Sequence, residues 1–252
     1  MFGSSVRAST ARHSLFGALD DGVRVATILE KCTEQLKHLE IHEEEPNDRD
    51  CIRDIPLIAG SFPYLETLTI SGTHGFAFSL ASVLRLLHLA PNLVQLALHD
   101  FWTFEPEEPI TEILVLPHLS TCLPNMFSLD KILRHLSLPV LETLCVPLNG
   151  ITFSELSLFL KRSSPPLRHL IIGEECLDFP FSALEEWLRF VPSLLQLELH
   201  WVQQPVANDL FAALAETASH LLPHLQNLQL HVYLESQFET PPPGSLAYET
   251  LL

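Results

Sequence analysis

The sequence predicts an α/β solenoid in which a strand, a loop, a helix and a second loop recur about eight times. Two observations carry this prediction. A six-residue pattern, Leu-x-x-Leu-x-apolar, returns along most of the chain, and a proline stands two residues before its first leucine in every copy but the first. Segments with the spacing of amphipathic helices lie between the copies. One such unit cannot bury its apolar face alone, but stacked copies share a continuous core.

The strand pattern and the prolines keep a common register. Successive pattern starts are 29, 28, 26, 22, 26, 27 and 31 residues apart, in or near the range of about 20–29 residues found in stacked strand–helix repeats. Proline has no N–H and disfavours helix in the residue before it, so we expect each proline to end a helix and release the chain as a strand. The starts are Leu36, Leu65, Leu93, Leu119 (a degenerate copy with Cys122 in its second apolar position), Leu141, Leu167, Leu194 and Leu225, and the prolines are Pro63, Pro91, Pro117, Pro139, Pro165, Pro192 and Pro223.

The segments between the strands carry helix start signals. Two of them open with capping boxes, Thr152 with Glu155 and Ser182 with Glu185. Ser79 and Asn208 are suitable N-caps for two others. The predicted helices lie within residues 20–32, 78–89, 111–116, 127–136, 152–162, 181–190 and 208–222, of which 111–116 has room for only a turn or two.

The solenoid is predicted to span residues 22–234, between a flexible N-terminus at 1–21 and a Pro-rich flexible tail at 235–252. The first nineteen residues lack acids and contain two arginines, so a transit peptide is the alternative for the N-terminus. The tail has the alternative of folding back over the last strand, whose edge would otherwise be open to pairing. Acidic stretches at 41–50 and 104–109 are interpreted as solvated loops, with a cation site or a basic-peptide contact as the alternative.

With these strands, prolines and helices, residues 22–234 resemble the leucine-rich repeat (LRR) family. The resemblance implies a curved parallel sheet on the concave side and helices on the convex side. The repeats are most similar in style to the repeat region of fungal F-box/LRR proteins, whose F-box docks an adaptor of a cullin-RING ubiquitin ligase. No F-box-like helical segment led by Leu-Pro-x-Glu precedes the repeats in this chain. The asparagine that the family places after the third apolar position is matched only by Asn149, so we expect irregular loops.

We therefore predict a non-enzymatic interaction module whose concave face selects a protein partner, with no cofactor. The F-box/LRR resemblance implies substrate recognition for an SCF-type ubiquitin ligase, with the adaptor bound through an N-terminal region outside this chain. The alternatives are a structural scaffold or spacer, and a hydrolase or metal-dependent enzyme on a repeat scaffold. No glycine-rich phosphate loop, GxSxG or HExxH pattern occurs, but a Ser/His/Asp triad is recognised only by its geometry.

The predicted partner-binding residues face outward between the inward leucines, because side chains alternate along a strand. This surface is polar at both ends and more apolar in the middle, around Cys145, Pro147 and Ile171. Trp201 is added as an aromatic anchor at a strand end. The predicted residues are Gln95, His99, Thr143, Cys145, His169, Ile171, Gln196, Glu198, His200, Trp201, Asn227, Gln229 and His231.

Histidine recurs at one of these outward positions. His200 and His231 should be neighbours on adjacent strands, near Glu198 and Gln229. Two stacked imidazoles can join a metal site or change charge near neutral pH. A metal site needs convergent ligands, so we interpret the pair as surface polar residues and expect no metal, with a pH-sensitive contact and a metal site as the alternatives.

Composition limits the partners and the compartment. The formal charge is −17, with only 14 scattered lysines and arginines; this argues against nucleic acid, because phosphate binding needs clustered cations. A basic partner surface and general solubility both fit this charge. The five cysteines form no CxxC pair, so we expect reduced thiols in an intracellular protein, cytoplasmic or nuclear. No apolar run reaches the roughly 20 residues that cross a bilayer, and we expect a monomer without membrane contact.

Overall fold

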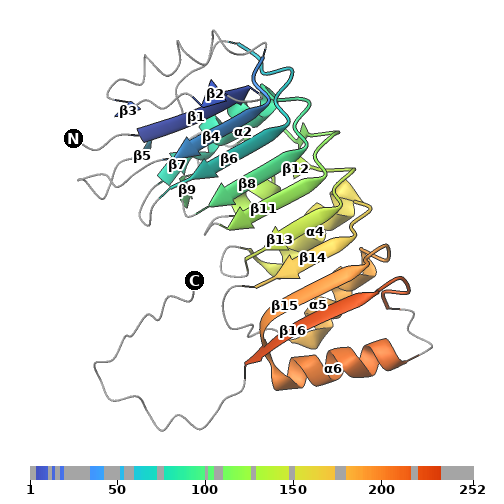
Figure 1. Cartoon of the computed structure of the whole chain (residues 1–252). Coiled ribbons are helices and arrows are strands. Elements are labelled where there is room, and N and C mark those ends of the chain that lie inside the picture. The colour runs from blue at the N-terminus through green and yellow to red at the C-terminus, as the bar shows by residue number, and fades with distance from the viewer. Residues whose placement is uncertain are drawn as a thin grey trace, which may run out of the picture.

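The chain has an α/β fold built on a large, mainly parallel sheet, as the computed structural model shows (Figure 1). The structure describes residues 4–10, 13–14, 18–19, 35–42, 52–53, 60–72, 77–99, 102–104, 110–125, 129–147, 151–173, 180–216 and 221–233. Eight strands pair in parallel and follow one another in sequence order, which is compatible with a solenoid-like arrangement. They are β4 (His38–His42), β6 (Thr67–Ser71), β8 (Gln95–His99), β11 (Thr121–Asn125), β13 (Thr143–Val146), β14 (His169–Ile172), β15 (Gln196–Gln203) and β16 (Asn227–Tyr233).

Each of these strands begins two residues after a predicted pattern start, and a recurring turn explains the position of the prolines. In the copy at Leu93, the backbone N–H of Leu93 donates to the carbonyl of Ala90 at 3.2 Å, and Pro91 occupies the second position of this four-residue turn. The same bond joins Leu194 to Val191 at 3.1 Å. Proline suits this position because its ring fixes φ near the value that the turn requires. The prolines therefore set the turn into each strand, and the helices end before them.

Five helices in the described part of the chain pack along one side of the sheet (Figure 1). Neighbouring helices contact one another in sequence order. Three of them, α2, α3 and α5, lie within segments that the sequence predicts as helical, and α4 extends one residue past its predicted segment. The predicted helix at 20–32 falls outside the described residues. The helices are α2 (Leu80–His88), α3 (Leu129–Leu133), α4 (Phe153–Ser163), α5 (Phe181–Arg189) and α6 (Gln204–Ala215).

The structure corrects three of the predicted helices, two at their starts and one that does not form. The capping box at Thr152 forms, since its hydroxyl oxygen accepts from the backbone N–H of Glu155 at 3.4 Å, but α5 begins with Pro180 rather than Ser182 as its N-cap. Helix α6 starts at Gln204, four residues before Asn208, with a proline in its first turn, where no N–H is needed. Residues 111–116 form no helix; β10 (Leu114–Val115) pairs instead with β12 (Leu136–Ser137).

Further strands extend the fold at its N-terminal end. Within the predicted flexible N-terminus, β1 (Ser4–Thr10) pairs antiparallel with β4, and β2 (His13–Ser14) and β3 (Ala18–Leu19) pair with β1. A three-stranded parallel sheet contains β5 (Ile52–Arg53), β7 (Ala77–Ser79) and β9 (Trp102–Phe104). Flexibility at 1–21 stays a prediction. The tail at 235–252, Asn149 and most of both acidic stretches lie outside the described residues.

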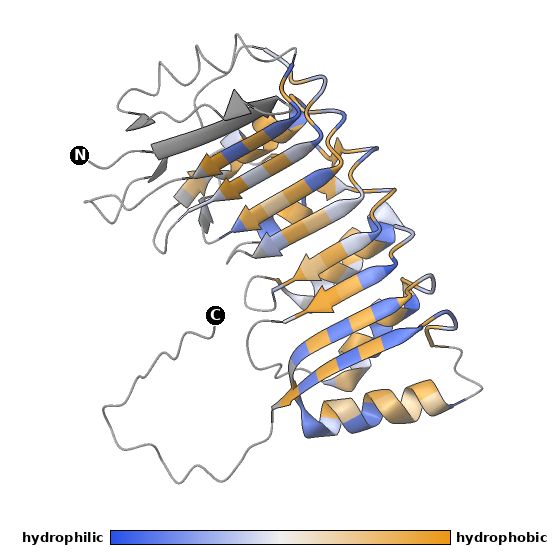
Figure 2. Ribbon diagram, in the orientation of Figure 1, coloured by the Kyte–Doolittle hydropathy of each residue, from blue (hydrophilic) through white to orange (hydrophobic). Residues whose placement is uncertain are grey.

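The core lies between the sheet and the helices. Along β6, β13 and β14 every second residue is buried. Figure 2 shows hydrophobic and hydrophilic residues alternating along β15 and β16. Arg162 of α4 closes the end of the preceding helix, because its guanidinium donates to the carbonyls of Leu133 and Leu136 at 2.6 and 2.7 Å. Burial lowers the pKa of this guanidinium. No helix in the described part of the chain is both long and apolar enough to span a bilayer.

Candidate functional site

The outward-facing residues of the eight parallel strands form three rows across the sheet. Strand pairing places His200 opposite His231, Glu198 opposite Gln229 and Gln196 opposite Asn227, and the same register continues through the other strands. The rows are the ones that the sequence predicts. We call the surface that they form the strand face. The first row is His38, Thr67, Gln95, Thr121, Thr143, His169, Gln196 and Asn227; the second is Glu40, Thr69, Ala97, Leu123, Cys145, Ile171, Glu198 and Gln229; the third is His42, Ser71, His99, Asn125, Pro147, Gly173, His200 and His231.

Most of the predicted partner-binding side chains are accessible on the strand face. All of them that the structure describes are exposed or half-buried, and the side chain of Trp201 lies outside the description. Pro147, which the sequence places on the open surface, is instead buried. Ala97 and Gly173 are also buried, because a small residue in a row lies below the level of its neighbours. The backbone at Trp201 departs from regular pairing, since the register shifts between His200 and Val202.

An apolar stripe crosses the middle of the strand face. Leu123, Cys145 and Ile171 are each half-buried. Cys145 stands opposite Ile171 in the pairing of β13 with β14, while Leu123 lies on the neighbouring strand β11. Polar residues of the first row, such as Thr143 and His169, border the stripe.

Cys122 and Cys145 lie on neighbouring strands but point to opposite sides of the sheet. Cys122 is 1% exposed and belongs to the core. Burial raises the pKa of the Cys122 thiol to about 12, and Cys145 nearby adds to this shift. Neither thiol forms a disulfide. Their opposite directions leave Cys145 as the thiol that reagents or a partner can reach.

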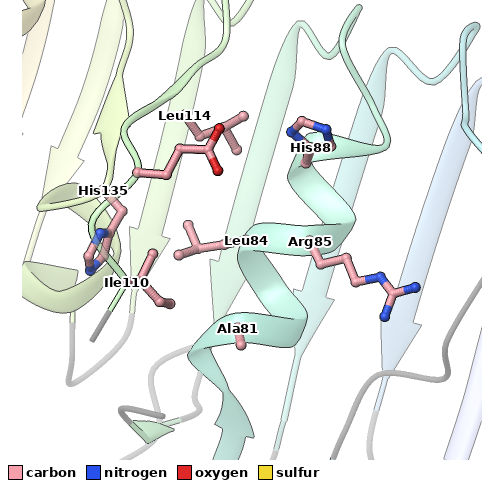
Figure 3. A pocket seen from close by; sticks show the side chains of 8 residues that line it. Ala81, Leu84, Arg85, His88, Ile110, Leu114 and His135 are labelled. Carbon is pink, nitrogen blue, oxygen red and sulfur yellow. The ribbon is translucent and has the colours of Figure 1, made fainter. Parts of the chain in front are cut away.

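The sequence gives no signal for a pocket on the helix side of the sheet. The pocket, of about 330 Å³, lies between α2 and the chain around residues 110–114 (Figure 3). Leu84, Ile110 and Leu114 supply apolar walls, and the charged Arg85 and Glu112 stand at its margin. Its volume is at the lower limit of small-molecule sites, about 300–1,000 Å³. Its residues come from segments that no single motif connects, so only the fold brings them together.

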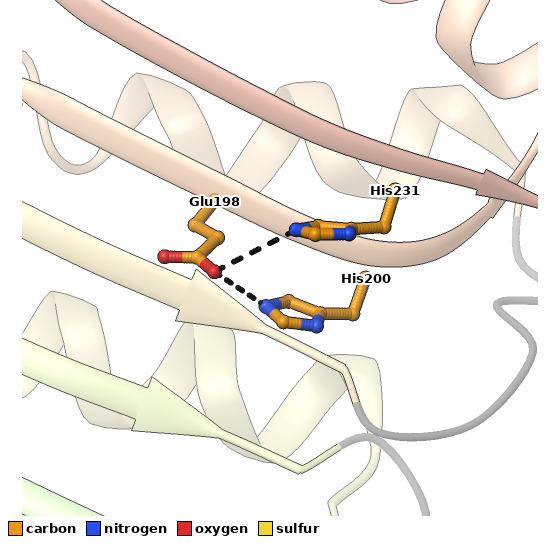
Figure 4. Close-up of side chains that lie close together, drawn as sticks. All are labelled: Glu198, His200 and His231. Carbon is orange, nitrogen blue, oxygen red and sulfur yellow. Dashed lines mark hydrogen bonds and ion pairs between the residues drawn. The ribbon is translucent and has the colours of Figure 1, made fainter. Parts of the chain in front are cut away.

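Three side chains of the strand face converge at β15 and β16 (Figure 4). The Glu198 Oε1 atom lies 2.7 Å from His200 Nε2 and 3.9 Å from His231 Nε2. The two imidazole rings are stacked, with centroids 4.5 Å apart and an angle of 18° between their planes. The predicted neighbourhood of His200, His231 and Glu198 is therefore confirmed, and the structure adds that one carboxylate oxygen faces both rings.

The cluster is partly accessible to solvent. The side chains of Glu198, His200 and His231 are 23%, 30% and 48% exposed. The amide nitrogen of Gln229 lies 3.0 Å from His231 Nε2. The Glu198–His200 and Gln229–His231 contacts are both hydrogen bonds when His200 carries its proton on Nε2 and His231 carries its proton on Nδ1, because Nε2 of His231 then accepts from the amide.

Gly173 directly follows β14 and packs against the backbone of His200. Its φ is +100°, and a Cβ atom there would lie 2.8 Å from the carbonyl oxygen of His200. Glycine adopts this backbone conformation without the steric cost that other residues meet. The close approach of the His200 carbonyl therefore requires a glycine at this position.

Comparisons with known proteins identify no relative. No family model matches the chain, and neither the curated proteins nor the solved structures include a match.

Proposed function

We propose that the chain is a leucine-rich repeat protein of about eight repeats, whose strand face is the concave surface and binds a protein partner. In this proposal the protein is a non-enzymatic recognition module. Its strongest support is the form of the strand face, where a half-buried apolar stripe lies beside the polar side chains of the first row. Extended surfaces of stacked repeats are suited to binding other macromolecules.

The size of the surface supports a protein partner over a small molecule. Eight parallel strands, spaced about 4.8 Å apart, extend over roughly 35 Å. An interface of standard size buries about 800 Å² on each partner, and a surface of this length can supply that area. The pocket beside α2 is much smaller and lies on the other side of the sheet.

The distribution of side chains supports one mode of binding. Leu123, Cys145 and Ile171 offer apolar contact area at the centre, where binding energy concentrates in interfaces. The polar residues of the first row that border the stripe, such as Thr143 and His169, supply hydrogen-bond donors and acceptors that fix the orientation of a partner. We propose that the partner places an apolar side chain on this stripe. The role as a substrate receptor for an SCF-type ubiquitin ligase belongs to the proposal through the F-box/LRR resemblance alone.

The proposal is tested by comparing partners captured by two matched surface variants. Ile171→Arg places a long charged side chain on the stripe. The control, Leu158→Arg, makes the same kind of change on α4, where the leucine is 61% exposed on the helix side. Each variant is expressed from its own gene in the natural host, and bound proteins are crosslinked and identified by mass spectrometry. Circular dichroism establishes that both variants remain folded.

We expect Leu158→Arg to keep the partners of the unchanged protein and Ile171→Arg to lose them. A ubiquitin-ligase adaptor and the other ligase subunits among the retained partners would support the receptor role. If Ile171→Arg keeps every partner while Leu158→Arg loses them, the binding surface lies on the helix side and the proposal is wrong. If no adaptor is captured, the ligase role is wrong and the strand-face proposal rests on the other partners.

A further inference from the structure

We propose that Glu198, His200 and His231 bind a divalent transition-metal ion of the zinc type. Each residue offers one ligand atom, and the three atoms lie within 4.8 Å of one another. Glu198 and His200 are two residues apart in β15 and therefore face the same side, while His231 lies opposite His200 in β16. The proposal concerns a metal site and does not depend on the protein-binding role.

The separations of the ligand atoms are close to those of a tetrahedral site. With metal–ligand distances of about 2.0–2.1 Å, two ligand atoms of tetrahedral zinc lie about 3.3–3.4 Å apart. The distance from Glu198 Oε1 to His200 Nε2 is 2.7 Å and the distance to His231 Nε2 is 3.9 Å. Each distance must change by roughly 0.6 Å to fit that geometry. Binding one ion also requires the stacked imidazoles to rotate until both Nε2 lone pairs point at the metal. The partial exposure of all three side chains leaves room for this rotation.

The charge at the cluster favours a cation. In the described part of the chain, Glu198 lies within 4.0 Å of the two imidazoles and forms no ion pair with a lysine or arginine. When the imidazoles are neutral, as metal ligands must be, the charge of the carboxylate is unbalanced and a bound dication would balance it. The chain as a whole carries a formal charge of −17, which raises the local concentration of cations.

The ligand types indicate which metal ions fit. Imidazole nitrogen suits zinc, copper and nickel, whereas calcium and magnesium require mainly oxygen ligands. One carboxylate and two imidazoles resemble the three-ligand sets of zinc sites that keep a fourth position open. Both histidines would bind through Nε2, which requires His200 to carry its proton on Nδ1. The fourth position would hold water, since all three side chains are partly exposed to solvent.

The test follows zinc binding at individual histidines. The full chain is titrated with Zn²⁺, and diethyl pyrocarbonate then modifies the histidines that remain unligated. Mass spectrometry of the digest gives the Zn²⁺ concentration that half-protects each histidine. His99 of β8 is the internal control, because it occupies the same row of the strand face but stands opposite Ser71 and Asn125 rather than another histidine.

Two ligand variants and one control variant complete the experiment. In Glu198→Gln and His231→Asn, half-protection of His200 should require at least about 100-fold more Zn²⁺, since altering even the outer-shell partners of metal ligands costs about 10–100-fold. His99→Asn should leave the protection of His200 unchanged. Mg²⁺ should protect none of these histidines. Glu198→Gln preserves the shape of the side chain, so it gives a readout even if His231→Asn disturbs the terminal strand.

Three results would overturn the metal site. The first is that His200 and His231 are half-protected at the same Zn²⁺ concentration as His99. The second is that Glu198→Gln leaves the half-protecting concentration unchanged. The third is that Mg²⁺ protects His200 as well as Zn²⁺ does.

Discussion

Replacing Leu197 by alanine should destabilise the fold much more than the same change at Leu228, which stands opposite it on the next strand. Leu197 is 1% exposed in the core, whereas Leu228 of β16 is only partly buried at the end of the sheet. The change of Leu197 to alanine removes three buried carbon groups, and about 2.4 kcal/mol of the free energy gained by moving them from water into the core is lost. The cavity that remains raises the cost to about 2–5 kcal/mol. At Leu228 solvent can enter the space, and we expect a cost of about 1–2 kcal/mol.

The assay is urea unfolding at 25 °C followed by far-ultraviolet circular dichroism. Gln196→Ala is the control, because this neighbouring side chain is exposed on the strand face and surface changes usually alter stability by less than about 0.5 kcal/mol. The comparison requires equal slopes of unfolding free energy against urea, since long repeat arrays can lose two-state behaviour. The reasoning would be refuted if both alanine substitutions lowered the free energy of unfolding by the same amount, with unchanged slopes against urea. In that case the burial of the leucine side chain would not determine the loss of stability.

Two further changes test particular contacts. Gly173→Ala should lower the free energy of unfolding by at least about 1–3 kcal/mol, because alanine is strained at a φ of +100° and its Cβ would meet the His200 carbonyl; Gly72→Ala, at a glycine without a positive φ, should cost less in the same urea assay. Iodoacetamide at pH 8 should label Cys145 well before Cys122 by mass spectrometry, because the buried Cys122 thiol has a pKa of about 12 and stays protonated. Since this pKa is raised in the folded state, the stability from Cys122 is complete below about pH 8.5, the pKa of a free thiol, and is lost as the pH rises toward 12. Rapid labelling of Cys122 in the folded protein would contradict its burial.

The neighbourhood of His200 and His231 could be predicted because both follow from strand register. Once the two copies of the strand pattern align, residues at the same position face each other across the sheet. The interpretation that they are separate surface polar residues did not anticipate the shared carboxylate oxygen of Glu198. That feature depends on how three side chains rotate toward one another, and the strand pattern sets only the side of the sheet to which they point.

Other differences have similar physical origins. The sequence predicts Ser182 and Asn208 as helix starts from their capping chemistry, but α5 and α6 begin earlier, at residues that follow extended N-caps. Residues 111–116 are predicted as a helix, but Leu114 and Val115 form a strand that pairs with Leu136 and Ser137. This partner strand is more than twenty residues away in the sequence. Local propensity is a weak preference that such tertiary contacts override.

The sequence alone determined the strand positions, the outward rows of the strand face and the segments that contain most helices. These features follow from periodicity along the chain, and alternation of side chains makes the register of each strand readable from its leucines. The tertiary structure decided the irregular pairing at Trp201, the close approach of Gly173 to the His200 carbonyl and the pocket beside α2. Each of these depends on atoms from different strands or helices, whose distances are fixed only when the repeats pack together.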